Sequence, residues 1–291
     1  MTNLACSLDA AIHRTGEYLT NIEVPAPHAL YLLGTGLGVL PSALSKVREF
    51  SFEDVPGVPD AWKSSILTTG ELEGCSIWLI EDVCGDPARD EVPFSDTEAW
   101  VPGFPVWLAA HLRASFCVHT AAGVLVNSER RGDLLGRLAV LRDHLNLSGQ
   151  TPLMGLGDSH LGPLFSDQTD LHHGALRRVA LSHAERLGLQ LAEAVCACTL
   201  GPSLLTPAER EYCARSGADI AVQGLASPLI ASAHSGLSVL SFVAVTDDGE
   251  AGLDIRGIVA ETDKLAPALD ELLTELASEL GTLAREIQDD E

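Results

Sequence analysis

The sequence predicts an α/β fold: a single domain over residues 1–291, in which a mixed, mostly parallel, twisted sheet is flanked by helices. Short apolar runs alternate with amphipathic stretches along the chain, an order typical of a sheet covered on both faces. Several of these runs end in segments rich in glycine or aspartate, and in such sheets ligands bind at the carboxyl ends of the strands. No internal repeat, low-complexity block or linker interrupts the pattern.

The apolar runs and the turn residues between them place the elements. We expect strands at 28–33, 65–69, 76–83, 116–120, 134–142, 189–199, 219–222 and 237–245. We expect helices at 3–19, 100–113, 171–187, 206–216, 228–234 and 261–287, and loops at 84–98 and 145–169. The helix at 206 has a clear start, because Thr206, Pro207 and Glu209 have the spacing of a capping box.

Composition excludes several partners. The chain holds 41 Asp and Glu against 18 Lys and Arg, a net charge of −23. Nucleic acids and anionic membranes need basic residues for binding, so neither is expected as a partner. No apolar stretch has the length of a membrane span, and no signal peptide is visible. We interpret the negative net charge mainly as a feature that keeps the protein soluble.

Seven cysteines, an odd number without a CxxC pair, are typical of buried thiols in a reducing compartment. We therefore expect a cytoplasmic protein. Cys196 and Cys198 alternate along one predicted strand and should share a face, but two ligands do not make a zinc site. No metal and no cofactor are expected.

Two strand ends and one polar pair are candidates for chemistry. Gly34-Thr35-Gly36-Leu37-Gly38 presents backbone N–H groups and a hydroxyl, which suit an anion, although such a run is more often only a turn. Asp247 and Asp248 end a long apolar strand and either bind a ligand or form a solvated turn. Asp143-His144 is either a catalytic dyad or part of a structural polar network, and we favour the network.

Four strand ends should converge on one cleft. They are Gly34–Gly38, Ala121–Gly123, Gly201–Ser203 and Thr246–Asp248. From these features alone the sequence indicates an α/β protein that binds a small anionic or sugar-containing ligand.

Read in order, the motifs resemble those of the trimeric purine nucleoside phosphorylases, a family that includes methylthioadenosine phosphorylase. The similar segments are Gly34-Thr35-Gly36-Leu37-Gly38, His119-Thr120-Ala121-Ala122-Gly123-Val124-Leu125, Gly132-Asp133-Leu134, Asp143-His144-Leu145-Asn146-Leu147-Ser148-Gly149, Pro152-Leu153-Met154-Gly155, Gly201-Pro202-Ser203 with Thr206 and Ala208-Glu209, Gly217-Ala218-Asp219 and His234-Ser235-Gly236-Leu237. They span roughly residues 28–285, and the resemblance implies the nucleoside phosphorylase fold.

The resemblance implies a phosphate site that is only partly kept. Thr35 matches the hydroxyl of the family's first loop, and Ala121 matches a backbone amide, in a segment continued by Ala122 and Gly123. An acid, Asp86, stands where the family has an arginine, and an acid beside a phosphate is repulsive. Arg89 is the nearest substitute.

The implied base and ribose contacts have changed as well. The phosphate-binding serine corresponds to Gly224, and the ribose-packing methionine to Gln223. Leu204 and Leu205 replace the family's Phe-Glu pair, which packs on and reads a 6-oxopurine. Asp247 replaces the base-reading asparagine, as in the branch that prefers 6-aminopurines, with Asp248 beside it.

If the family reaction is kept, Asp247 would carry a proton for the leaving base in an apolar cleft beside Leu204 and Leu205. Three functions stay open: a divergent enzyme acting at the N-glycosidic bond of a nucleoside or nucleoside-like substrate in a specialised pathway, a phosphate-dependent phosphorylase with a rebuilt phosphate site, and a non-catalytic ligand-binding member. The resemblance also implies a homotrimer, with a residue near Phe165 completing the neighbouring site.

Overall fold

The computed structural model describes residues 7–34, 42–81, 98–249 and 255–289. The described residues form a nine-stranded mixed sheet in the order β2-β3-β4-β1-β5-β8-β7-β6-β9. The strands are β1 Ala29–Leu33, β2 Ser45–Ser51, β3 Ile66–Leu72, β4 Cys75–Glu81, β5 Phe116–Leu125, β6 Arg137–Asn146, β7 Leu191–Thr199, β8 Ile220–Gln223 and β9 Ser238–Asp247. The α-helices are α1 Ser7–Asn21, α2 Phe104–His111, α3 Arg131–Leu134, α4 Gly174–Leu187, α5 Pro207–Arg215, α6 Ala226–Ser235 and α7 Ile255–Asp289.

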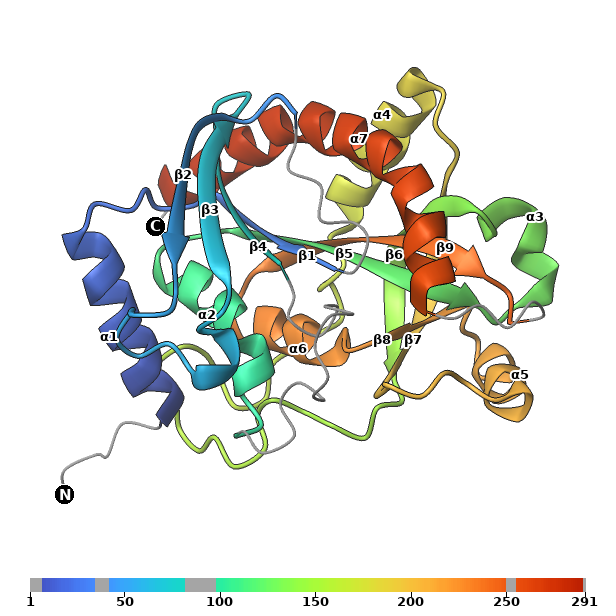
Figure 1. Cartoon of the computed structure of the whole chain (residues 1–291), viewed down its shortest axis with the longest axis horizontal. Coiled ribbons are helices and arrows are strands. Elements are labelled where there is room, and N and C mark those ends of the chain that lie inside the picture. Colours follow the sequence, from blue (N-terminus) through green and yellow to red (C-terminus); the bar gives the residue numbers. More distant parts are fainter. Residues whose placement is uncertain (1–6, 35–41, 82–97, 250–254, 290–291) are drawn as a thin grey trace.

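Strand β5 joins two parts of the sheet. It pairs in parallel with β1 on one side and with β9 on the other, and its last residues pair antiparallel with β8. Because β9 also pairs with β6, strands β5, β8, β7, β6 and β9 close into a ring. Strands β4, β3 and β2 continue outward from β1, with β3 and β2 antiparallel to their neighbours (Figure 1).

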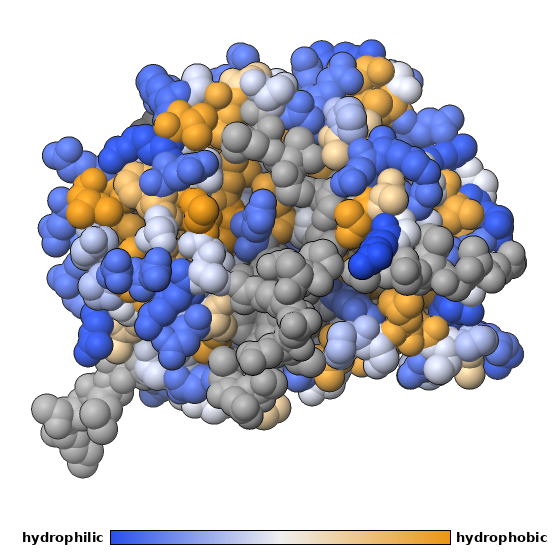
Figure 2. All heavy atoms as spheres, viewed as in Figure 1, coloured by the Kyte–Doolittle hydropathy of each residue, from blue (hydrophilic) through white to orange (hydrophobic). Residues whose placement is uncertain are grey.

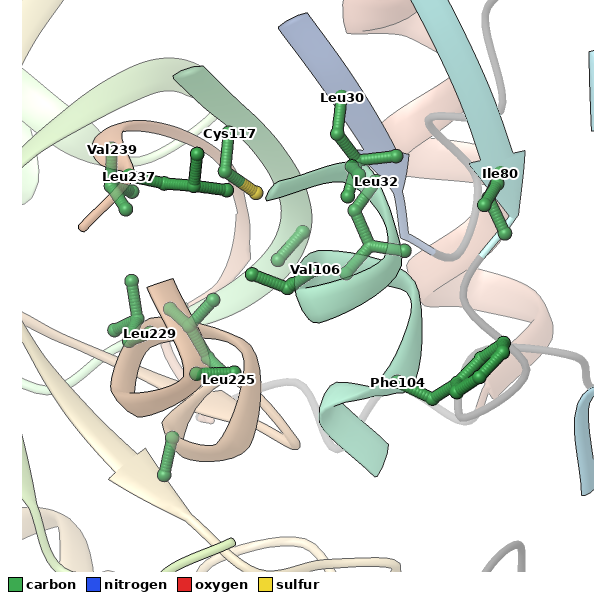
Figure 3. Packing of buried hydrophobic residues seen from close by; sticks show 14 of the residues in the cluster. Leu30, Leu32, Ile80, Phe104, Val106, Cys117, Leu225, Leu229, Leu237 and Val239 are labelled. Carbon is green, nitrogen blue, oxygen red and sulfur yellow. The ribbon is translucent and has the colours of Figure 1, made fainter. Parts of the chain in front are cut away.

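Helices cover the sheet from two sides, as the alternation of side chains along β5 requires. Cys117 packs in the core shared with α1, α2 and α6, whereas Phe116 and Val118 pack in the core shared with α4 and α7. In Figure 3, Val106 of α2 and Leu229 of α6 lie beneath the strands in the first of these cores. Burying such side chains contributes roughly 1.5–3 kcal/mol each, which fixes the sheet between its helices.

The predicted fold class is confirmed, but several strand bounds differ from the prediction: β3, for example, continues to Leu72, beyond the predicted end at residue 69. Strand β2 was not expected, because its sequence SKVREFS has no apolar alternation. All its side chains except that of Phe50 are exposed, and it lies at the edge of the sheet. Strand β5 continues to Leu125, beyond the predicted end at Thr120, because β8 and β9 pair with its last residues. Strand β6 begins at Arg137 and not at Leu134, since residues 131–134 form α3.

The helices follow the prediction more closely. The capping box at Thr206 and Glu209 is present at the start of α5. The predicted helix 100–113 divides into a 3₁₀ turn, Val101–Gly103, and α2. Helix α7 begins six residues before the predicted Glu261. The predicted loop 84–98 lies, except for Glu98, outside the described residues.

The visible surface is mainly hydrophilic, with apolar groups scattered between the charged ones (Figure 2), as a net charge of −23 requires. None of the helices in the described part of the chain combines the length and the apolar character that a bilayer crossing needs.

Candidate functional site

The end of β1 is held tightly against β5. The backbone N–H of Gly34 donates to Oγ1 of Thr120 at 3.0 Å. A Cβ on Gly34 would overlap the carbonyl oxygen of Thr120, so only glycine fits at this contact. Gly34, the last residue of β1's loop end that the structure describes, therefore lies against Thr120 and Ala121, two residues of the motif on β5. Thr35, the predicted hydroxyl ligand, lies outside the described residues.

Asp247 ends β9 beside the same strand, where it pairs with Val124 of β5. Its side chain is nearly buried, with 9% relative exposure, and Oδ1 accepts a hydrogen bond from the N–H of Gly249 at 2.7 Å. Asp248 instead forms an ion pair with Arg131 of α3. The two carboxylates thus have different partners, and the local structure supports Asp247 alone as a group available to a ligand.

The β7–α5 loop lies next to the end of β8. Gln223 Nε2 donates to the carbonyl oxygen of Ser203 at 2.8 Å, and Gly201 lies against the Gln223 side chain. Gly224 follows Gln223 and donates its N–H to the carbonyl oxygen of Thr199 at 3.2 Å. The loop and the β8 end are therefore in direct contact in the structure.

The two leucines of this loop have different environments. Leu204 is 56% exposed, whereas Leu205 packs against a small core cluster that contains Cys213 and Ala221. An apolar side chain at position 205 is driven into this cluster by its removal from water. Of the two leucines predicted to form apolar surroundings for Asp247, only Leu204 is exposed. The side chain of Leu205 packs against the core cluster instead.

Arg210 of α5 connects the loop to the β9 end. Its Nη1 donates to the carbonyl oxygen of Leu205 at 3.3 Å. A Cβ on Gly249 would overlap the Arg210 guanidinium, which therefore lies against the Gly249 backbone. Gly249 has a φ of +73°, a second reason for glycine at this position. These contacts bring the β7–α5 loop and the Asp247–Gly249 turn together.

Of the remaining predicted site residues, three lie within a strand and one lies outside the described residues. Ala121, Ala122 and Gly123 lie inside β5, and not in a loop after it as the sequence suggested, because β9 pairs with all three. Arg89 lies outside the described residues. Within the described ranges, no group of three His, Cys, Asp or Glu side chains gathers as a metal site would need.

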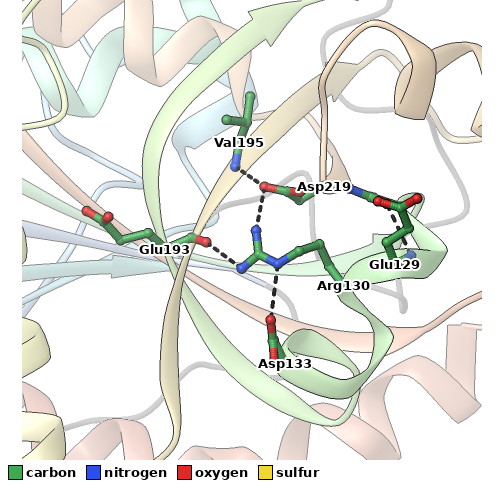
Figure 4. Close-up of polar contacts among 7 residues, drawn as sticks. Glu129, Arg130, Asp133, Glu193, Val195 and Asp219 are labelled. Carbon is green, nitrogen blue, oxygen red and sulfur yellow. Dashed lines mark hydrogen bonds and ion pairs between the residues drawn. The ribbon is translucent and has the colours of Figure 1, made fainter.

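A buried ionic network supports the segment that carries Arg131 (Figure 4). Arg130 Nη1 lies 3.2 Å from Asp219 Oδ2, and its Nη2 donates to the carbonyl oxygen of Glu193 at 3.1 Å. Asp219 also accepts from the N–H of Val195 at 3.0 Å and from Asn127 Nδ2 at 3.2 Å. The network fixes the chain after β5 onto β7 and β8, and so fixes the residue that pairs with Asp248.

Asp143 and His144 belong to a polar network that includes His172. His144 Nδ1 and His172 Nε2 are 3.1 Å apart, and the N–H of His144 donates to Asp143 Oδ1 at 2.8 Å. Burial, with a smaller contribution from neighbouring His144, lowers the pKa of His172 to about 4. Burial also lowers the pKa of His119 on β5 to about 4. Both imidazoles are therefore neutral at physiological pH.

Sequence reasoning missed Arg130, Arg131 and Arg210. One weak indication of a special role for Arg210 was present in the sequence. A cation near the start of a helix interacts unfavourably with the helix dipole, so Arg210 does not serve to stabilise the helix. No local signal identified the contacts of Arg130 with Asp219 or of Arg131 with Asp248, since these partners lie far along the chain, next to β8 and β9.

The family model described as the phosphorylase superfamily matches residues 104–278. Purine nucleoside phosphorylase 1 of Geobacillus stearothermophilus is 28% identical over 251 residues, which cover 84% of this chain and 86% of that protein. Purine nucleoside phosphorylase of Bos taurus is 27% identical over 242 residues, 80% of each chain.

A solved structure agrees on the fold. Isoform 2 of purine nucleoside phosphorylase from Schistosoma mansoni, in complex with cytosine and ribose-1-phosphate, superposes with a TM-score of 0.81. It is 19% identical and covers 94% of this chain and 98% of its own. Because the family model matches more than half of the chain, the chain belongs to the phosphorylase superfamily.

Proposed function

We propose that this protein is a divergent enzyme that acts at the N-glycosidic bond of a purine nucleoside or nucleoside-like substrate, in a specialised pathway. The observation that carries the proposal is the placement of Asp247: a nearly buried carboxylate at the end of β9, paired with the motif strand β5 and linked through Gly249 and Arg210 to the β7–α5 loop. Relatives named purine nucleoside phosphorylase, which match about four-fifths of the chain, support the same reaction class.

In this proposal Asp247 interacts with the base as it leaves. Cleavage of an N-glycosidic bond leaves positive charge on the sugar and negative charge on the departing base. A carboxyl group that donates its proton to the base favours departure, and general acid catalysis of this kind contributes about 10²- to 10⁴-fold in rate. The surroundings of Asp247 supply a fixed orientation, since the N–H of Gly249 holds Oδ1 and leaves Oδ2 for the ligand.

The nucleophile is the point on which the alternatives differ. The resemblance associates Thr35 and Ala121 with phosphate. Gly34, which directly precedes Thr35, lies against Ala121, and this supports the alternative of a phosphate-dependent phosphorylase. Gly224 lacks the hydroxyl of the family's phosphate-binding serine, and Leu205 lacks the carboxylate of the base-reading glutamate. These differences support a reaction in which water or an internal group replaces phosphate, or a non-catalytic binding role.

We also infer a homotrimer in which Phe165 reaches the site of a neighbouring copy. Phe165 is 92% exposed, and Leu164 and Met154 of the same irregular stretch are 42% and 65% exposed. Burying a phenylalanine side chain is favourable by roughly 1.5–3 kcal/mol, so covering these residues would stabilise an assembly. Five buried free cysteines in the described residues support a cytoplasmic location, and one continuous sheet supports a single domain over residues 1–291.

The deciding experiment is a chromatographic assay of the purified protein with purine nucleosides and 5′-modified adenosines, with and without phosphate. Release of free base in either condition supports the proposal. Release only with phosphate establishes a phosphorylase, and release without it establishes a hydrolase or an internal transfer. Absence of any turnover, with a ligand retained through purification, would favour the binding role and contradict the enzyme.

A further inference from the structure

Arg210 lies between the β7–α5 loop and the turn that follows Asp247. Its guanidinium lies across two segments, bonded to the Leu205 carbonyl oxygen at 3.3 Å and packed on the Gly249 backbone. Gly249 in turn donates to Asp247 Oδ1 at 2.7 Å. Two contacts therefore connect a permanent cation to the candidate catalytic carboxylate, and the side chain remains partly exposed.

The stability of α5 does not account for this arginine. Arg210 lies near the start of the helix, where the dipole disfavours a cation. By contrast, Arg215 lies in the last turn of the same helix and forms an ion pair with Glu211. Across the described residues no carboxylate lies within ion-pair distance of Arg210, in a chain with 41 acidic residues.

We propose that Arg210 is a specificity-determining residue that donates hydrogen bonds to an acceptor group on the substrate's base; this inference rests on the proposed function. A guanidinium carries five N–H donors and no acceptor, and it holds them in a rigid fork. Its commonest contact with a base is a bidentate one, to O6 and N7 of guanine. Leu205, in contrast, packs into the core and has no polar side-chain atom with which to read a base.

The class of base follows from this donor set. A 6-oxopurine offers two neighbouring acceptors, O6 and N7, whereas a 6-aminopurine offers N7 beside an amino group that is itself a donor. A guanidinium facing an amino group leaves a donor opposite a donor, which costs the desolvation of an unmade hydrogen bond. Arg210 therefore favours 6-oxopurines, which opposes the preference for 6-aminopurines that Asp247 alone implied.

The test is isothermal titration of the whole protein with hypoxanthine and with adenine as free bases. We expect the wild type to bind hypoxanthine more tightly than adenine. Arg210→Met should weaken hypoxanthine binding by about 10- to 100-fold and adenine binding by less than about 3-fold, in line with the discrimination of a bidentate pair. Arg210→Lys keeps the charge without the fork and should lose most of the same discrimination.

Arg215→Met is the matched control, because it removes one positive charge from the same helix at an exposed position. It should leave both affinities unchanged. Equal losses for the two bases with Arg210→Met would show that the arginine only fastens the loop, and would overturn the inference. A wild type that prefers adenine, or that binds neither base, would overturn it as well.

The titration needs no turnover, so it separates this inference from the proposed function. Arg210-dependent binding of hypoxanthine without release of base from any nucleoside would support the role of Arg210 and contradict the proposed reaction. Should Arg210→Met fail to fold, judged by its melting curve, Arg210→Lys provides the comparison.

Discussion

Removing the Arg130 side chain should destabilise the protein far more than its partial exposure suggests. Arg130 faces Asp219, whose side chain is only 8% exposed, at 3.2 Å. Taking one partner from a buried ion pair costs about 3–5 kcal/mol, because the other charge is left uncompensated. Asp219 keeps its hydrogen bonds from Val195 and Asn127, and Arg130 is 29% exposed. We therefore expect Arg130→Met to lower the free energy of unfolding by about 2–3 kcal/mol.

The matched control is Asp133→Asn, which touches the same guanidinium from the solvent side. Asp133 lies 3.3 Å from Arg130 Nε and its side chain is 66% exposed, so its loss should cost less than about 1 kcal/mol. Urea unfolding followed by circular dichroism measures both values, provided that the slope with urea is unchanged.

A double-mutant cycle tests the physical cause. Once Asp219→Asn has removed the buried charge, Arg130→Met should cost about 1–2 kcal/mol less than it does alone. Additive effects, or equal losses for Arg130→Met and Asp133→Asn, would refute the reasoning that the buried carboxylate of Asp219 sets the cost.

Three further predictions concern the site, the assembly and the response to acid. Asp247→Asn should lower turnover by about 10²- to 10⁴-fold; unchanged turnover would remove its assigned role. Phe165→Ser should shift a trimer toward monomers in analytical ultracentrifugation, and a wild-type monomer would contradict the assembly. Because the pKa of His119 falls to about 4 on folding, from an ordinary value near 6.5, the unfolded chain binds the extra proton between these values. Stability should therefore fall as pH drops from 6.5 to 4, by up to about 3 kcal/mol for this residue. His119→Leu should flatten that part of the urea-unfolding profile, and an identical profile would contradict the assignment.

The sequence was sufficient for the central strands and for the order of the motifs. β1, β5 and β9 are almost entirely buried and consist mainly of apolar residues, which propensity and burial specify together. It was insufficient for β2, whose exposed side chains carry no pattern and whose pairing depends on β3. The length of β5 was also underestimated, because its last residues are strand only through β8 and β9.

The candidate site divides in the same way. Asp247 could be named from the sequence, because a carboxylate at the end of an apolar strand has a position fixed by the sheet. The separation of Asp247 from Asp248 could not, since it depends on Arg131, more than a hundred residues earlier. Nor could Arg210, whose contact with Gly249 exists only once the tertiary structure brings α5 to the Asp247–Gly249 turn. Local periodicity determines which residues form strands and helices, whereas long-range packing alone decides which charges meet at their ends.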